Sequence, residues 1–239
     1  MKSIAITFRS NALTIPINYQ HGVQSMLYSA LQAAGGRGEE WHDGGFYYGL
    51  RRYKLFTFSS LRGKKIIANG KITFESLIYL DVRGVQGDFC DALLEALEKN
   101  PKLTLLGAPL SVLAVQCSTP QIQTGTVNIK MLSPVTVHKT ENEKTHYYTP
   151  LDTDFSEQVC ENFRRKYTAF TGQEPADSIV LTPQRVGVKD KYVTTFKGTY
   201  ITGWRGEYSL SGRPEYLTFL YYCGLGARNS DGFGMFEIL

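Results

Sequence analysis

The sequence predicts an α+β protein built from two successive units with the element order βαββαβ. Strand-like segments with alternating apolar residues are interleaved with segments whose apolar residues recur at helical spacing. The same order is found twice along the chain, and a polar stretch with a proline, residues 119–125, separates the two halves. This order is that of ferredoxin-like (RRM-like) domains. We therefore expect two tandem ferredoxin-like domains, residues 1–120 and 121–239.

The first half begins with an alternating strand rich in Ile and Phe, followed by a helix whose stripe includes Val23, Leu27, Leu31 and Ala34. The sequence GGRG at residues 35–38 ends this helix. A loop rich in glycine and aromatic residues is expected from there to about residue 48. The expected elements of this half are strand 2–9, helix 20–34, strands 53–59 and 71–80, helix 88–99 and strand 103–117.

The second half repeats the plan. Its first helix is expected to begin near Asp152 or Asp154, either of which suits an N-cap. The expected elements of this half are strand 126–138, helix 153–170, strands 179–188 and 192–200, helix 214–223 and strand 233–239. The cations Arg164, Arg165 and Lys166 are expected on the surface of the first of these helices.

The composition describes a soluble globular protein, with 42% hydrophobic and 20% charged residues among 239. The formal net charge is only +4, but residues 44–74 contain no acidic residue. A surface of one sign suits a polyanion such as RNA. The cations of this run are Arg51, Arg52, Lys54, Arg62, Lys64, Lys65 and Lys71.

Several classes of protein are not supported. The four cysteines are widely spaced with no CxxC pair, so we expect buried, reduced thiols. The four histidines lack metal-ligand spacing, so neither a metal nor another cofactor is expected. The sequence has no signal-peptide pattern and no apolar run of membrane-spanning length, which predicts a cytoplasmic protein without a membrane partner.

The C-terminal stretch GLGARNSDGFGMFEIL is unusually rich in glycine. A helix-to-strand connection accounts for Gly224 and one further glycine, but not easily for four glycines around Arg228. The spacing fits neither a dinucleotide fingerprint nor a P-loop. We expect this glycine-rich loop to direct backbone N–H groups and Arg228 at RNA phosphates. Its glycines are Gly224, Gly226, Gly232 and Gly234.

The spacing GLG…GFG ahead of a final apolar strand resembles the C-terminal signature of the RAMP superfamily, and LSPV at residues 132–135 is a weaker mark. Within that superfamily the chain is most similar to the pre-crRNA processing endoribonucleases. The resemblance covers most of the chain and implies two ferredoxin-like domains. It also implies CRISPR repeat RNA as the partner, and leaves open binding to subunits of a CRISPR effector complex and homodimer formation.

Three residues near the basic run resemble the Tyr, His and Lys triad of those enzymes. His42 lies in the loop WHDGG, Tyr28 lies at the edge of the first helix's apolar stripe, and Lys54 lies at the start of the strand YKLFTFS. The resemblance assigns them the catalytic role, with Lys54 the least secure because loop lengths vary. Packing at the helix edge would also explain Tyr28, and a solvated strand end would explain Lys54. His21 is the rival histidine because it shares the helix face of Tyr28.

These residue types suit RNA cleavage by attack of the 2′-hydroxyl on the neighbouring phosphorus. Histidine moves protons near neutral pH, tyrosine orients or exchanges one, and lysine stabilises the phosphorane charge. The resemblance implies a metal-independent endoribonuclease leaving 2′,3′-cyclic phosphate and 5′-hydroxyl ends, with Arg51 and Arg52 binding RNA. The alternative is a RAMP subunit that holds crRNA without cutting it. A general RRM protein is less favoured because no RNP1 pattern is present.

Overall fold

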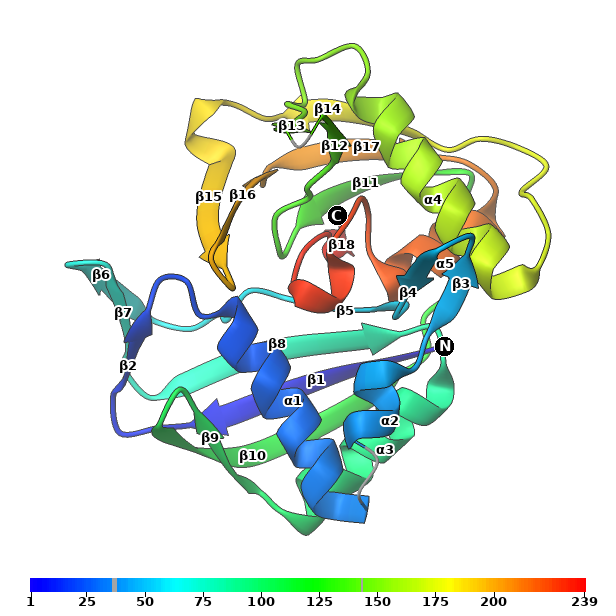
Figure 1. The fold of residues 1–239 in the computed structure, drawn as a ribbon. Helices are drawn as coiled ribbons and strands as arrows, with labels where there is room; N and C mark the ends of the chain where they lie inside the picture. The colour runs from blue at the N-terminus through cyan, green and yellow to red at the C-terminus, as the bar shows by residue number, and fades with distance from the viewer. Residues whose placement is uncertain (36–37, 143) are drawn as a thin grey trace.

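The computed structural model describes residues 1–35, 38–142 and 144–239; the side chain of Ala34, expected on the apolar stripe, lies outside the described part. Two antiparallel sheets, each with helices, lie one above the other, and the C-terminal loop lies between them (Figure 1). One sheet is formed by residues before position 120 and the other by residues after it. The 120/121 boundary itself remains a prediction.

The N-terminal sheet has the strand order β5-β8-β1-β10-β9. Without the added strand β9, this order is second, third, first and fourth, as βαββαβ units require. Helices α1 and α3 pack against each other and against this sheet. The elements are β1 (Lys2–Arg9), α1 (Gln20–Gly35), β5 (Phe56–Phe58), β8 (Leu77–Gly84), α3 (Gly87–Lys99), β9 (Lys102–Leu105) and β10 (Ala108–Ser118).

The C-terminal sheet has the equivalent order, β14-β17-β11-β18. Pro214 at the start of α5 fits the first helical turn, where its missing N–H costs no hydrogen bond. The two ferredoxin-like units predicted from the sequence are therefore present. The elements are β11 (Thr126–Met131), α4 (Phe155–Thr171), β14 (Val180–Arg185), β17 (Glu207–Ser211), α5 (Pro214–Cys223) and β18 (Phe236–Ile238).

Short helices and strands are added to the two ferredoxin-like units. A three-stranded sheet β2-β7-β6 extends from one end of the N-terminal sheet, and the hairpin β3–β4 reaches toward α4 (Figure 1). The short elements are β2 (Leu13–Pro16), α2 (Gly38–Asp43), β3 (Phe46–Tyr48), β4 (Arg51–Tyr53), β6 (Lys65–Ala68), β7 (Lys71–Phe74), β12 (His138–Glu141), β13 (Lys144–Tyr147), β15 (Lys191–Phe196), β16 (Thr199–Trp204) and two 3-10 turns, η1 (Val188–Asp190) and η2 (Asn229–Asp231).

The two domains share a core. Leu55 and Val85 belong to the N-terminal half but pack in the hydrophobic cluster of the C-terminal domain. The buried Arg83 on β8 donates to the carbonyl oxygen of Phe236 on β18 at 2.6 Å, and its guanidinium lies 3.6 Å from the ring centre of Tyr221. These contacts fix the sheets relative to one another, so side chains from both domains can form one site.

Several sequence expectations need correction. The loop expected from residue 38 contains helix α2 and the hairpin β3–β4, and the connection between the first strand and the first helix contains β2. The strand expected over residues 126–138 stops at Met131, where the N–H groups of Leu132 and Ser133 both donate to the Met235 oxygen and so do not continue the ladder. The segments expected as single strands at residues 71–80 and 192–200 are two strands each. Cys117 is exposed, whereas Cys90 and Cys223 are buried as expected.

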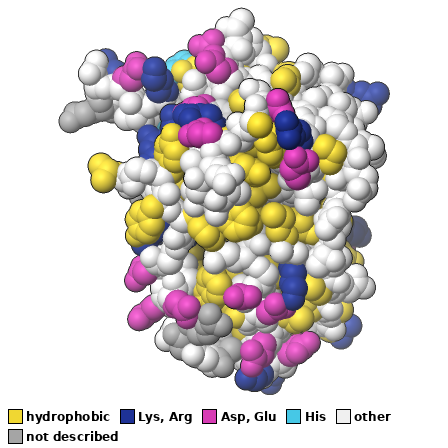
Figure 2. Space-filling view, turned by 90° about the vertical axis from the view of Figure 1, so that its right-hand side faces the viewer, with side chains coloured by type: hydrophobic (Ala, Val, Ile, Leu, Met, Phe, Trp, Pro, Cys, Tyr) yellow, Lys and Arg dark blue, Asp and Glu magenta, His cyan; other side chains and the backbone are white. Residues whose placement is uncertain are grey.

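The molecular surface over α4 and α5 is mixed in charge. Figure 2, which views the right-hand side of Figure 1, shows hydrophobic side chains in the middle of this face and both signs of charge side by side above them. This face therefore carries no basic patch. Among the described helices, none combines the length and apolar character needed to span a membrane.

Candidate active site

Tyr28 on α1, His42 on α2 and Lys54 in the connection between β4 and β5 meet beside the domain interface. The rings of Tyr28 and His42 contact edge to face, with 5.3 Å between their centres. The Lys54 Nζ lies 3.3 Å from the Tyr28 hydroxyl and 5.1 Å from the centre of its ring. The three residues selected from the sequence thus form one cluster of a proton carrier, a hydroxyl and a cation.

His42 lies on the short helix α2 and not in the loop expected from its flanking glycines. Helix α2 packs on α1, which carries Tyr28, so the two rings are held together by helix contact. The His42 side chain is 53% exposed, which leaves it open to a substrate. Its Nδ1 lies 2.8 Å from the Asp43 carboxylate.

Asp43 orients the histidine. An ionised carboxylate only accepts hydrogen bonds, so Nδ1 of His42 carries the proton and Nε2 is the free basic nitrogen. This hydrogen bond from His42 is also the main cause that lowers the pKa of Asp43. Arg52 donates to the backbone oxygen of Asp43 and fixes the end of α2.

Burial shifts the pKa values of the other two residues of the cluster, Tyr28 and Lys54. Desolvation raises the pKa of Tyr28, and the Asp231 carboxylate raises it further. Tyr28 is therefore a neutral hydroxyl that can donate a hydrogen bond at physiological pH. Burial and the neighbouring Arg52 lower the pKa of the Lys54 ammonium.

Two cavities open on this cluster. One, of about 390 Å³, is lined by His21, Tyr28, His42 and Lys197. His21 is thus near the cluster, and its ring lies edge-on to Phe196 at 6.3 Å. Both histidines considered from the sequence face the same cavity, but only His42 has its ring against Tyr28.

The other cavity is an interdomain cleft of about 480 Å³. It is rich in nitrogen donors from both domains, which makes it suited to phosphate groups. Arg51, Arg52 and Arg228, all predicted from the sequence to bind RNA, line it together with Lys54. The remaining polar lining includes His138, Asn162, Lys166, Asn229 and Ser230, with Gly226 supplying backbone.

The basic run seen in the sequence is not one patch. Its first part lines the cleft, whereas Arg62 pairs with Asp81 at 2.8 Å and Lys64 pairs with Glu75 at 3.0 Å. Glu75 lies between β7 and β8 and Asp81 lies on β8, both outside the stretch in which the sequence shows one sign. The expectation of a single basic surface over residues 44–74 was therefore wrong.

The glycine-rich loop differs from the expected anion-binding loop. The N–H groups of Gly224, Gly232 and Gly234 donate to backbone carbonyl oxygens within the protein, at 2.7, 3.0 and 2.9 Å. They lie outside the cleft lining and are not available to bind phosphate. Gly226 is buried too, although it lines the cleft, and Arg228 is the cationic residue of the loop that lines it.

The glycines are required for close packing instead. Gly232 has φ +87°, and a Cβ there would lie 2.4 Å from the Phe58 ring of the other domain. Gly234 has φ +79°, and a Cβ there would lie 2.0 Å from the oxygen of Leu225. The loop is therefore a compact plug between the two domains.

Lys166 anchors the glycine-rich loop. This role was not identified from the sequence, which led us to expect Lys166 on the surface of the helix. It is 3% exposed, and burial lowers the pKa of its ammonium. Its Nζ donates to the carbonyl oxygens of Gly224 (2.5 Å) and Gly226 (3.1 Å) and to the Asn229 side chain (3.0 Å). Lys166 continues the buried stripe of Phe155, Val159 and Phe163, and this spacing was the available signal.

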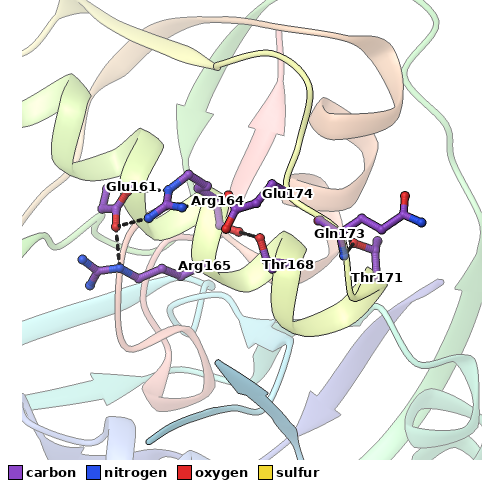
Figure 3. Close-up of polar contacts among 7 residues, drawn as sticks. All are labelled: Glu161, Arg164, Arg165, Thr168, Thr171, Gln173 and Glu174. Carbon is purple, nitrogen blue, oxygen red and sulfur yellow. Dashed lines mark hydrogen bonds and ion pairs between the residues drawn. The ribbon is translucent and has the colours of Figure 1, made fainter. Parts of the chain in front are cut away.

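The two neighbouring arginines do lie on the surface of α4, as expected. Figure 3 shows Arg164 and Arg165 both bonded to Glu161, at 2.8 and 2.7 Å, while Arg164 also reaches Glu174. Their charges are offset by Glu161 on the same helix and by Glu174 just beyond its end. They consequently add little to the positive potential of the cleft.

Comparison with known proteins gives the family. A model of the family described as CRISPR associated protein Cas6, C-terminal, matches residues 117–238, more than half of the chain. The chain belongs to the Cas6 family. Curated relatives include the CRISPR-associated endoribonuclease Cas6 1 of Methanocaldococcus jannaschii, 26% identical over 94% of this chain and 87% of the relative. The CRISPR-associated endoribonuclease Cas6 of Pyrococcus furiosus is 20% identical over 96% of this chain and 86% of the relative.

Solved structures support the Cas6 fold along the whole chain. A Cas6-related protein of Pyrococcus furiosus superposes with a TM-score of 0.84 at 22% identity, covering 99% of this chain and 98% of the other. A RAMP protein described as binding different RNA substrates has a TM-score of 0.83 at 21% identity, with both chains fully covered. Both domains therefore follow the fold of this family.

Proposed function

We propose that this chain, an endoribonuclease of the Cas6 family, binds CRISPR repeat RNA in the interdomain cleft and cuts pre-crRNA without a metal ion. The observation that carries the proposal is the cluster of Tyr28, His42 and Lys54 at the edge of a cleft lined by arginines. The cleft supplies charge for phosphate groups, and the cluster supplies proton transfer and charge stabilisation.

The proposed reaction is attack of a ribose 2′-oxygen on the adjacent phosphorus. A bond forms between the 2′-oxygen and phosphorus while the bond to the 5′-oxygen breaks. The 2′-hydroxyl loses a proton, and the leaving 5′-oxygen gains one. The products are an RNA ending in a 2′,3′-cyclic phosphate and an RNA beginning with a 5′-hydroxyl, and no water is consumed.

His42 is the proposed proton carrier. With Nδ1 bonded to Asp43, its Nε2 accepts the proton of the 2′-hydroxyl or, once protonated, donates to the 5′-oxygen. The Lys54 ammonium stabilises the charge that develops on the phosphoryl oxygens. The neutral Tyr28 hydroxyl, bonded to Lys54, donates to the same oxygens or orients the 2′-hydroxyl.

The cleft arginines are proposed to hold the RNA backbone. Arg51, Arg52 and Arg228 present guanidinium groups, which match phosphate oxygens in two-pronged geometry. Because they line the same cavity as Lys54, a bound strand would be led directly to the reactive cluster. This arrangement favours a cutting enzyme over a subunit that only retains crRNA.

The direct test is incubation of the purified protein with repeat RNA in excess EDTA, followed by analysis of the product ends. We expect one cut whose 5′ fragment resists periodate until its cyclic phosphate is removed. A repeat with 2′-deoxyribose at the cut nucleotide should bind equally well and stay intact. A requirement for added divalent metal, or cleavage of the deoxy substrate, would overturn the chemistry. Binding without any cleavage would favour the RNA-holding subunit.

A further inference from the structure

We infer that Asp231, in the glycine-rich loop of the C-terminal domain, is a positioning residue of the reactive cluster. Its hydrogen bond with Gln24 of α1 fixes the helix that carries Tyr28, and it brings a carboxylate to the same face of that helix. The catalytic consequence rests on the proposed function, while the electrostatic influence of Asp231 on Lys54 can be tested without cleavage.

The loop presents Asp231 rigidly. Asn229 donates to the carbonyl oxygens of Leu225 (2.9 Å) and Phe233 (3.0 Å), which closes the loop across its base. Thr57 of β5 donates to the same oxygen of Phe233 at 3.0 Å. Together with Lys166 these contacts hold the turn η2 against the N-terminal domain, so the carboxylate at its end has a fixed location.

Gln24 connects this turn to the reactive cluster. Its buried side chain donates from Nε2 to the Ser230 carbonyl oxygen at 2.7 Å and to Asp231 Oδ1 at 2.9 Å. Gln24 lies one helical turn before Tyr28 on α1, and residues at that spacing share a helix face. The face of α1 that presents Tyr28 is thereby tied to the C-terminal domain.

The charges around the cluster act on the pKa of Lys54 in opposite directions. Burial and Arg52 lower the pKa of Lys54; Asp231 is the largest influence raising it, ahead of Asp43, and Lys197 lowers it again. Asp231 itself is buried, which raises its pKa, but it is paired with Arg228 at 3.5 Å. The other facing groups are the Tyr28 hydroxyl and the Gln24 amide.

The sign of the effect follows from these contacts. Lys54 stabilises a developing negative charge only while it is protonated. Removing the Asp231 charge leaves burial and Arg52 less opposed, so Lys54 loses its proton at lower pH. The alkaline limb of the cleavage profile should move to lower pH in the same direction.

The test measures Lys54 directly. Competitive acetylation of the full-length protein across a pH series, read by mass spectrometry, gives the titration of each lysine. Asp231→Asn keeps an oxygen to accept from Gln24 and removes only the charge, and we expect it to shift the Lys54 titration to lower pH. The matched control is Asp177→Asn, which removes an exposed carboxylate paired with Arg213 and should leave Lys54 unchanged. An unshifted Lys54 in folded Asp231→Asn would overturn the inference, whether or not the protein cuts RNA.

A second variant separates charge from helix anchoring. Gln24→Ala breaks the tie to α1 but keeps the Asp231 charge, so cleavage should fall by up to about 10²-fold, as for a misplaced reacting group. Its Lys54 titration should match wild type. If Gln24→Ala shifts Lys54 as far as Asp231→Asn does, the effect comes from loosened structure and Asp231 has no electrostatic role. Wild-type protein that fails to cut RNA while Lys54 shifts in Asp231→Asn would reject only the proposed function.

Discussion

At the scale of single residues, the cluster depends on side chains whose environments differ sharply. His42 is half exposed and oriented by its neighbour Asp43, whereas Tyr28 and Lys54 are partly buried against each other. The three residues were predictable because they match, position by position, the Tyr, His and Lys triad of the pre-crRNA processing endoribonucleases that the sequence resembles. Asp231 and Lys166 were not predicted, because their partners lie far away in the sequence.

Tyr28→Phe tests the role of the hydroxyl alone. The phenylalanine ring keeps the contacts with His42 and Phe56, so the melting temperature should stay close to that of wild type. The single-turnover cleavage rate should fall by about 10²-fold, the loss typical of one hydrogen-bond donor to developing charge. An unchanged rate would mean that Tyr28 only packs at the helix edge.

At the scale of elements, the long helices with a regular apolar repeat could be predicted from the sequence. Elements that depend on tertiary packing could not. Helix α1 was predicted to within one residue because Val23, Leu27 and Leu31 repeat over several turns. Helix α2 was missed because glycines flank a segment of only six residues. Residues 133–137 look like strand because most of them are apolar and buried, yet Gly234 donates to the Pro134 oxygen where a sheet partner would bond.

The glycine-rich loop gives an element-scale prediction about stability. Gly172→Ala places a Cβ at φ +77° in open space and should destabilise the protein by about 1–2 kcal/mol. Gly232→Ala has a similar backbone strain and a further collision with Phe58, which adds about 1–3 kcal/mol for overpacking. Urea unfolding should therefore give a clearly lower free energy of unfolding for Gly232→Ala than for Gly172→Ala. Equal stabilities would mean that the loop does not plug the interface.

At the scale of the whole molecule, the site exists only because two similar domains are joined through a shared core. The N-terminal domain supplies the reactive cluster, and the C-terminal domain supplies Arg228, Lys166 and the loop. Tandem ferredoxin-like domains could be predicted from the repeated element order. The way their faces meet could not, since contacts such as that of Arg83 with Phe236 carry no local signal.

Charge in the interdomain cleft predicts the salt dependence of RNA binding. Arg51→Glu should weaken repeat binding and reduce the magnitude of the log–log salt slope by about 0.7 for each RNA phosphate that the arginine had neutralised. Lys144→Glu makes the same charge change at an exposed lysine outside the cleft lining and should leave the slope nearly unchanged. Filter binding from low to high salt measures both variants. Equal slopes would remove the case for a cleft that binds RNA.

The most direct measurement of the central claim is single-turnover cleavage of repeat RNA in EDTA by His42→Ala beside wild type and His21→Ala. His42 carries the proposed proton transfer, so its loss should lower the rate by about 10²–10⁴-fold while repeat affinity stays within a few-fold. His21→Ala, which alters a residue of the same cavity without a ring contact to Tyr28, should keep most of the rate. An active His42→Ala together with an inactive His21→Ala would contradict the assignment of the reactive cluster.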